Sequence, residues 1–233
     1  MEKQNYVINN LYEYLEILDK VPRLYIFRGQ ENFNWEVIPS LARYPSVLRD
    51  FKYWYEFENY ILEEFQKYSI RFLNDKPTKD IDWLVLAQHH GLPTKLLDWT
   101  LNPLVALYFA VNNSYCKNNS LVIALSPNSW SIDIPDIHID NFDLYFPKHI
   151  DEQIISQHSC FTFHPLPNFD GPFLPIDKLE IDAELMVKFE IPNSRRRSIL
   201  ESLDHIGINH YSLFQNLDGI GRYFKEKYYD IIY

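Results

Sequence analysis

Apolar side chains recur at steps of three and four residues in several segments of this chain, and each such segment predicts an amphipathic helix. The longest covers residues 54–72, where an aromatic stripe is expected to lie in the core. Shorter helices are expected over residues 11–18 and 194–206, the second of them ended by Gly207. A last helix is expected to carry the aromatic residues of segment 223–228.

Three other segments alternate in polarity or run as short apolar stretches, which is typical of strands. They are residues 23–30, 120–126 and 184–191. Residues 128–177, rich in Pro, Asp and aromatic side chains, are too long for an empty loop and are expected to hold short strands. Because the chain shows no repeat or linker, we expect residues 1–233 to form one α+β domain with flanking helices on a mixed or antiparallel sheet.

A polar segment interrupts two apolar helical stretches in the middle of the chain. Gly91 suits the left-handed end of the first helix, Asn102 can cap the second, and Pro103 fits its first turn. Residues 92–100 are therefore expected to be a short extended link. The polar side chains gathered here are Gln88, His89, His90, Thr94, Asp98, Thr100 and Asn102.

This polar segment has two interpretations. The Asp98 carboxylate, the Thr100 hydroxyl and the free backbone amides of the second helix can face one place, and helix amino ends attract phosphate or carboxylate groups. Alternatively, Asp98 and Thr100 only tie the link to the helix, as Asx and Ser/Thr turns do. The spacing does not decide between a binding site and a structural turn.

Arg28 raises the same question at the end of the strand predicted over residues 23–30. It falls on the face of that strand that carries Leu24 and Ile26, directly before Gly29. A guanidinium on an apolar face needs an anionic partner. An internal carboxylate and a ligand phosphate both satisfy that need.

Charge and cysteine content narrow the function classes. The formal net charge of -10 at pH 7 argues against charge-driven binding to nucleic acid. Arg195, Arg196 and Arg197 form a tight basic run, for which a solvated helix face is expected and a phosphate-binding patch is the alternative. Cys116 and Cys160 make neither a disulfide framework nor a zinc-ligand spacing, so we expect them to be reduced.

The sequence shows no pattern typical of a membrane span, a secretory signal or a metal site. The amino terminus lacks the apolar core of a secretory signal, and no apolar run approaches the roughly 20 residues of a membrane span, so a cytoplasmic protein is expected. The adjacent His89 and His90 would point about 100° apart on a helix and cannot share a metal ion. No HExxH, GxSxG or phosphate-loop motif is present, and no metal site is expected.

Four motifs resemble the FRG domain family, named for its Phe-Arg-Gly motif. They are FRGQ at residues 27–30, AQHHGLPTKLLDWTLNPLVALYFA at 87–110, QHSCFT at 157–162 and GINHYSLFQNLDGI at 207–220. The resemblance covers about residues 8–225. Ser159 stands where the family often has Gly, and Gln215 stands where it often has Pro.

The order of these motifs is also similar to ADP-ribosyltransferases of the arginine, serine, glutamate type, which implies an ADP-ribosyltransferase-like fold with NAD as cofactor. In that comparison Arg28 matches the residue that grips the NAD phosphates or ribose. LDWT at residues 97–100 matches the motif that shapes the nicotinamide pocket. The resemblance implies catalytic roles for Gln157 and Asp98, and nucleotide contacts from Arg28, Gly29, Gln88, His90, Thr94, Thr100 and Asn102.

Gln157 stands where such a transferase would have its glutamate. An amide can still hydrogen-bond the ribose hydroxyl, but it supplies no negative charge to the developing cation. Transferase activity is then expected to be weak or absent unless Asp98, Glu180 or Glu184 substitutes.

Three functions therefore stay open. The first is an NAD- or nucleotide-dependent transferase that modifies a protein or nucleic acid, as in a toxin or phage-defence effector. The second is a nucleotide sensor with the same pocket and no chemistry, and the third is a protein-interaction domain that uses surface Tyr and Phe residues. A carboxylate beside the pocket separates the first two, and a polar cluster buried as a structural network would favour the third.

Overall fold

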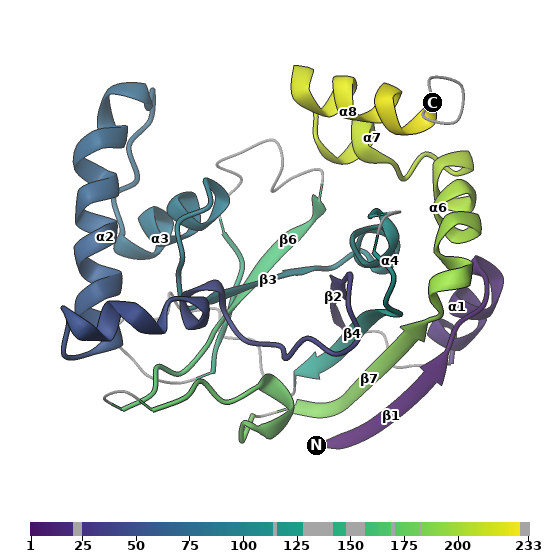
Figure 1. Cartoon of the computed structure of the whole chain (residues 1–233), viewed down its shortest axis with the longest axis horizontal. Helices are drawn as coiled ribbons and strands as arrows, with labels where there is room; N and C mark the ends of the chain where they lie inside the picture. Colours follow the sequence, from purple (N-terminus) through teal and green to yellow (C-terminus); the bar gives the residue numbers. More distant parts are fainter. Residues whose placement is uncertain are drawn as a thin grey trace.

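The computed structural model describes residues 1–20, 25–113, 116–127, 142–147, 157–168, 171–181 and 183–228 (Figure 1). Its described strands form one mixed sheet of seven strands in the order β1-β7-β4-β2-β3-β6-β5. They are β1 (Glu2–Val7), β2 (Ile26–Gln30), β3 (Leu96–Thr100), β4 (Ser120–Pro127), β5 (Leu144–Tyr145), β6 (Ser159–Phe163) and β7 (Ala183–Ile191). Strand β1 pairs with β7 in parallel and the other pairs are antiparallel, which confirms the α+β class with a mixed sheet.

Helices flank this sheet as expected (Figure 1). They are α1 (Leu11–Leu18), α2 (Trp54–Ser69), α3 (Asp80–His89), α4 (Pro103–Val111), α6 (Arg196–His205), α7 (His210–Leu213) and α8 (Leu217–Lys227). Single 3-10 turns lie at η1 (Ser40–Arg43), η2 (Pro45–Arg49), η3 (Ile70–Phe72), η4 (Ile176–Lys178) and η5 (Asn193–Arg195). Helices α1, α4 and α6 pack in one cluster with β4 and β7, whereas α2 and α3 pack near β3 and β6.

Helix α4 crosses β2 at very close range because Gly29 has no side chain. A Cβ built on Gly29 would lie 2.0 Å from the carbonyl oxygen of Ala106 and 2.7 Å from the backbone nitrogen of Ala110. Any other residue would push the helix off the strand. This contact fixes α4 against the face of β2 that carries Gly29.

Local signals in the sequence gave most of these elements. Asn10 caps α1 by accepting from the backbone amide of Glu13, and Asn102 caps α4 by accepting from that of Leu104. Gly91 and Gly207 have φ of +84° and +85°, so both chain reversals use the left-handed conformation. Residues 23 and 24 of the first predicted strand, including Leu24, lie outside the described part of the chain.

The structure departs from the prediction at two strands. The link expected at residues 92–100 ends as β3, an interior strand between β2 and β6. Strand β1 was not predicted, because its sequence EKQNYV is mostly polar and its pairing partner lies about 180 residues away along the chain.

The aromatic stripe of α2 enters the core only in part. Trp54 is buried and Phe57 and Phe65 are partly buried, whereas Tyr68 and Phe72 are 73% and 72% exposed. The expectation that the whole stripe is core was therefore wrong. A helical period shows which side chains share a face, but it does not show how far the neighbouring elements extend along that face.

The basic run at Arg195–Arg197 is also corrected. Arg195 and Arg197 are exposed as expected, but Arg196 is only 3% exposed. Its guanidinium donates to the carbonyl oxygens of Glu31, Asn118 and Ala110 at 2.8, 3.2 and 3.0 Å. Arg196 therefore ties α6 to the end of α4 and to the chain after β2, and it is not part of a solvated face.

Cys116 and Cys160 are free thiols, as predicted. Within the described residues, no group of three or more His, Cys, Asp or Glu side chains is placed to hold a metal ion. The helices in the same part of the chain are all too short or too polar to cross a membrane.

Candidate functional site

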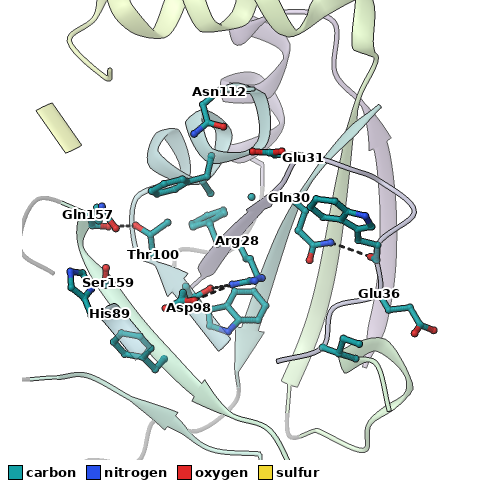
Figure 2. Close-up of a pocket in the computed structure, with 18 of the residues that line it drawn as sticks. Arg28, Gln30, Glu31, Glu36, His89, Asp98, Thr100, Asn112, Gln157 and Ser159 are labelled. Carbon is teal, nitrogen blue, oxygen red and sulfur yellow. Dashed lines mark hydrogen bonds and ion pairs between the residues drawn. The ribbon is translucent and has the colours of Figure 1, made fainter. Parts of the chain in front are cut away.

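A cavity of about 450 Å³ opens beside β2, β3 and α4 (Figure 2). Sites for small molecules commonly occupy about 300 to 1,000 Å³, so the volume suits a ligand of nucleotide size. Aromatic side chains supply much of the wall: Phe27, Trp35, Trp99, Phe109, Phe161 and Phe214. The charged side chains in the wall are Arg28, Arg43, Glu31, Glu36 and Asp98.

Arg28 is a charged group of this wall that the protein satisfies only in part. Its Nη1 donates to the backbone oxygen of Asp98 at 2.6 Å and lies 3.8 Å from the Asp98 carboxylate, which is too long for a hydrogen bond. Its Nε is buried and has no hydrogen-bond partner among the described residues. The guanidinium therefore has unused donors where it meets the cavity.

Burial lowers the pKa of Arg28, the carboxylate of Asp98 opposes this shift, and the positive charge of Arg43 adds to the lowering. The side chain is 20% exposed, so the remaining contact with solvent is through the cavity. An anion entering there would replace lost hydration with charge-assisted hydrogen bonds.

A chain of side-chain hydrogen bonds fixes the Asp98 carboxylate. The Thr94 hydroxyl donates to Oε1 of Gln88, and Nε2 of Gln88 donates to Oδ2 of Asp98 at 2.9 Å. The same Nε2 also lies 3.2 Å from the backbone oxygen of Leu96. Thr94 is fully buried, whereas the Asp98 side chain is 56% exposed, so the chain runs from the core to the cavity.

Thr100 and Gln157 meet on another side of the cavity, where Figure 2 shows them joined. The Thr100 hydroxyl donates to the backbone oxygen of Gln157 at 2.5 Å and accepts from the backbone amide of Asn102 at 3.0 Å. The Gln157 amide donates to the backbone oxygen of Leu213 at 3.2 Å, which joins this side to α7. Both residues therefore line the cavity and also hold backbone segments in place.

The predicted site residues divide into three groups. Arg28, Gly29, Asp98, Thr100 and Gln157 line the cavity. Gln88 and Thr94 stand behind Asp98 and orient it. His90 and Asn102 are not part of the wall: His90 follows the end of α3 and is exposed, and the Asn102 side chain caps α4.

Several wall residues were not found from the sequence. His89 lines the cavity in place of its neighbour His90, which follows from the turn of about 100° between adjacent helix residues. Arg43 and Trp35 come from the chain between β2 and α2, which carries no periodic signal. Gln30 fixes this segment by donating to the backbone oxygen of Trp35 at 3.1 Å.

Asn112, at the end of α4, is a further wall residue that the sequence did not indicate. Its Oδ1 is buried without a hydrogen-bond partner among the residues described. The Oδ1 atom of Asn112 and the Nε atom of Arg28 are thus two buried polar atoms of wall residues that have no hydrogen-bond partner among the described residues.

These features define an α+β protein with a polar and aromatic cavity over a mixed sheet. The family model of the FRG domain matches residues 23–119, which confirms the resemblance that the motifs of this segment predicted. Comparisons with curated proteins and with solved structures gave no match. The matched segment holds Arg28, Arg43, Asp98 and Asn112, and Gln157 lies beyond it.

Proposed function

We propose that the cavity binds a nucleotide, with NAD as the first ligand to test, and that Arg28 holds a ligand phosphate. One observation carries this proposal: Arg28 is largely withdrawn from solvent at a cavity wall and makes a single hydrogen bond with the described residues. A buried guanidinium without an adequate partner is unfavourable, and a phosphate supplies the acceptors that it lacks.

The aromatic wall supports a nucleotide over a simple anion. Trp35 and Phe109 line the same cavity as Arg28, and aromatic rings bind bases by stacking. Asp98 and Thr100 of the central polar segment line this cavity, so the segment is not wholly enclosed in a structural network. Their position favours a binding site over the protein-interaction alternative. The nearby network of Gln88 and Thr94 serves to orient Asp98, which is the kind of support that binding sites require.

NAD cleavage is a second candidate, and the position of Asp98 favours it. Its exposed carboxylate lies in the cavity wall, 3.8 Å from Arg28, where it can stabilise positive charge that develops on a ribose. Gln157 provides no charge, so Asp98 is the residue to which we assign this role. Transfer to a protein or nucleic acid, as in toxin or phage-defence effectors, rests on the transferase resemblance.

The two candidates separate in one experiment. Calorimetric titration with NAD and with ADP-ribose measures binding, and chromatography of the same mixtures measures released nicotinamide. We expect both ligands to bind. Binding without nicotinamide release supports a sensor, whereas release that Asp98→Asn abolishes at unchanged NAD affinity supports catalysis. No binding of either ligand at millimolar concentration would rule out the proposed function.

A further inference from the structure

Arg43 carries the second guanidinium in the cavity wall, and the fold fixes the turn from which this side chain extends. It ends the η1 turn, in which Leu41 is fully buried. The backbone amide of Leu41 donates to the backbone oxygen of Thr94 at 3.2 Å, and the amide of Thr94 donates to the Ser40 hydroxyl at 3.2 Å. Thr94 therefore anchors the turn that carries Arg43 as well as the chain of hydrogen bonds that orients Asp98.

The acidic groups in the wall already have partners. Glu36 pairs with Lys178 at 3.6 Å, and Glu31 accepts from the Asn113 amide at 2.8 Å. Asp98 accepts from Gln88 at 2.9 Å.

The two arginines of the wall have fewer partners than these acidic groups. Arg43 is exposed and its side chain makes no hydrogen bond or ion pair with any residue that the structure describes, and the Arg28 side chain has only Asp98. Two guanidiniums that face one cavity repel each other, and the positive charge of Arg43 contributes to the lowered pKa of Arg28. A ligand with one charged group can compensate one of them, whereas two linked anionic groups can compensate both.

We infer that Arg28 and Arg43 together select a diphosphate group, so that the cavity takes nucleoside diphosphates and dinucleotides in preference to nucleoside monophosphates. Arg28 holds one phosphate at the inner wall, and Arg43 holds the adjacent phosphate nearer to solvent. This inference rests on the proposed function. It adds that the diphosphate group is the part of the ligand that the cavity selects.

The test compares AMP and ADP, because they share base and ribose and differ by one phosphate. Dissociation constants are measured by calorimetry in a chelating buffer for wild type, Arg43→Gln, Arg43→Glu and Arg28→Ala. Arg197→Ala is the matched control, since it removes one positive charge from an exposed position of α6 outside the cavity wall. Melting temperatures confirm that each variant is folded.

We expect wild type to bind ADP more tightly than AMP. Arg43→Gln should weaken ADP binding about tenfold, the scale of one charge-assisted hydrogen bond, with little effect on AMP. Arg43→Glu should weaken ADP binding further, Arg28→Ala should weaken both ligands, and Arg197→Ala should change neither.

Failure of this inference is distinct from failure of the proposed function. If wild type binds AMP and ADP equally, or if Arg43→Gln affects both alike, the diphosphate preference is wrong and nucleotide binding stands. If wild type binds neither nucleotide, the proposed function and this inference are both overturned.

Discussion

Arg28 and Arg196 are both withdrawn from solvent in this fold, but the protein satisfies them to different degrees. Arg196 is 3% exposed, and its two terminal nitrogens donate to three backbone carbonyls from separate segments. Arg28 is 20% exposed, donates to one carbonyl, and otherwise has a carboxylate at 3.8 Å. Both leave Nε without a described partner, so the difference lies in the terminal nitrogens.

This comparison separates a structural arginine from a candidate binding arginine. The partners of Arg196 come from the end of α4, the chain after β2 and the turn before β4, so it stabilises the junction of three segments. Arg28 joins only neighbouring strands and faces a cavity. Substitution of Arg196 should therefore reduce stability, and substitution of Arg28 should reduce binding.

The largest expected effect is that of Arg196→Ala on stability. Because one buried and two partly buried carbonyls lose a charged donor, we expect the free energy of unfolding in urea to fall by about 3 to 5 kcal/mol. Arg197→Ala, at the adjacent exposed position, should change it by less than about 0.5 kcal/mol. Equal effects of the two substitutions would contradict the structural role of Arg196.

A smaller effect is expected from His164, a buried basic group that avoids charge altogether. Its Nε2 donates to the backbone oxygen of Leu174 at 2.7 Å, its Nδ1 has no described partner, and burial lowers its pKa to about 4. In the unfolded chain the pKa of this ring is about 6.5, so the unfolded state takes up a proton first as the pH falls. The contribution of neutral His164 to the free energy of unfolding is therefore fully present above about pH 6.5. It falls as the pH drops toward 4, by at most about 1.4 kcal/mol per pH unit.

The measurement for His164 compares urea unfolding at pH 7 and pH 5. Wild type should lose about 2 kcal/mol more than His164→Gln over this interval, since the variant lacks the titrating ring. Parallel pH profiles of the two proteins would show that His164 does not control acid sensitivity.

The smallest effects concern Gln157. Gln157→Ala removes the hydrogen bond to the Leu213 carbonyl and should reduce stability by about 0.5 to 1.5 kcal/mol. Gln157→Glu also loses this donor but places a carboxylate at the cavity, so the transferase analogy predicts more NAD cleavage.

Nicotinamide release at equal folded fraction tests the analogy. No gain in Gln157→Glu, together with unchanged NAD binding in Gln157→Ala, would remove Gln157 from the site and leave the analogy on Arg28 and LDWT alone.

Local chemistry explains which parts of the fold could be predicted. Asn10 and Asn102 cap helices, and Gly91 reverses the chain, through contacts within a few residues, so the sequence signals them directly. The pairing of β1 with β7 and the burial of Arg196 depend on segments that are distant in sequence. No periodic pattern encodes such contacts.

The residues of the candidate site also divide into those that the local sequence signals and those placed by contacts between distant segments. Arg28 and Asp98 were predicted because they were expected at the ends of elements and fall in the motifs. They are the middle residues of β2 and β3, and they meet in the cavity. His90 was assigned to the site and His89 was not, but the helix turn brings His89 to the wall instead. Arg43 reaches the wall through a turn anchored on Thr94, a contact across 54 residues that the sequence does not show.

The most direct test of the nucleotide site measures NAD affinity and unfolding free energy together in wild type, Arg28→Ala and Arg28→Lys. We predict that Arg28→Ala weakens binding by about 1.5 to 3 kcal/mol, and that Arg28→Lys recovers only part of this loss because it lacks the planar fork. Unfolding of Arg28→Ala in urea should change by less than about 1 kcal/mol, unlike that of Arg196→Ala. Equal NAD affinity in wild type and Arg28→Ala, with a large loss of stability, would show that Arg28 is a second structural arginine and would contradict the proposed site.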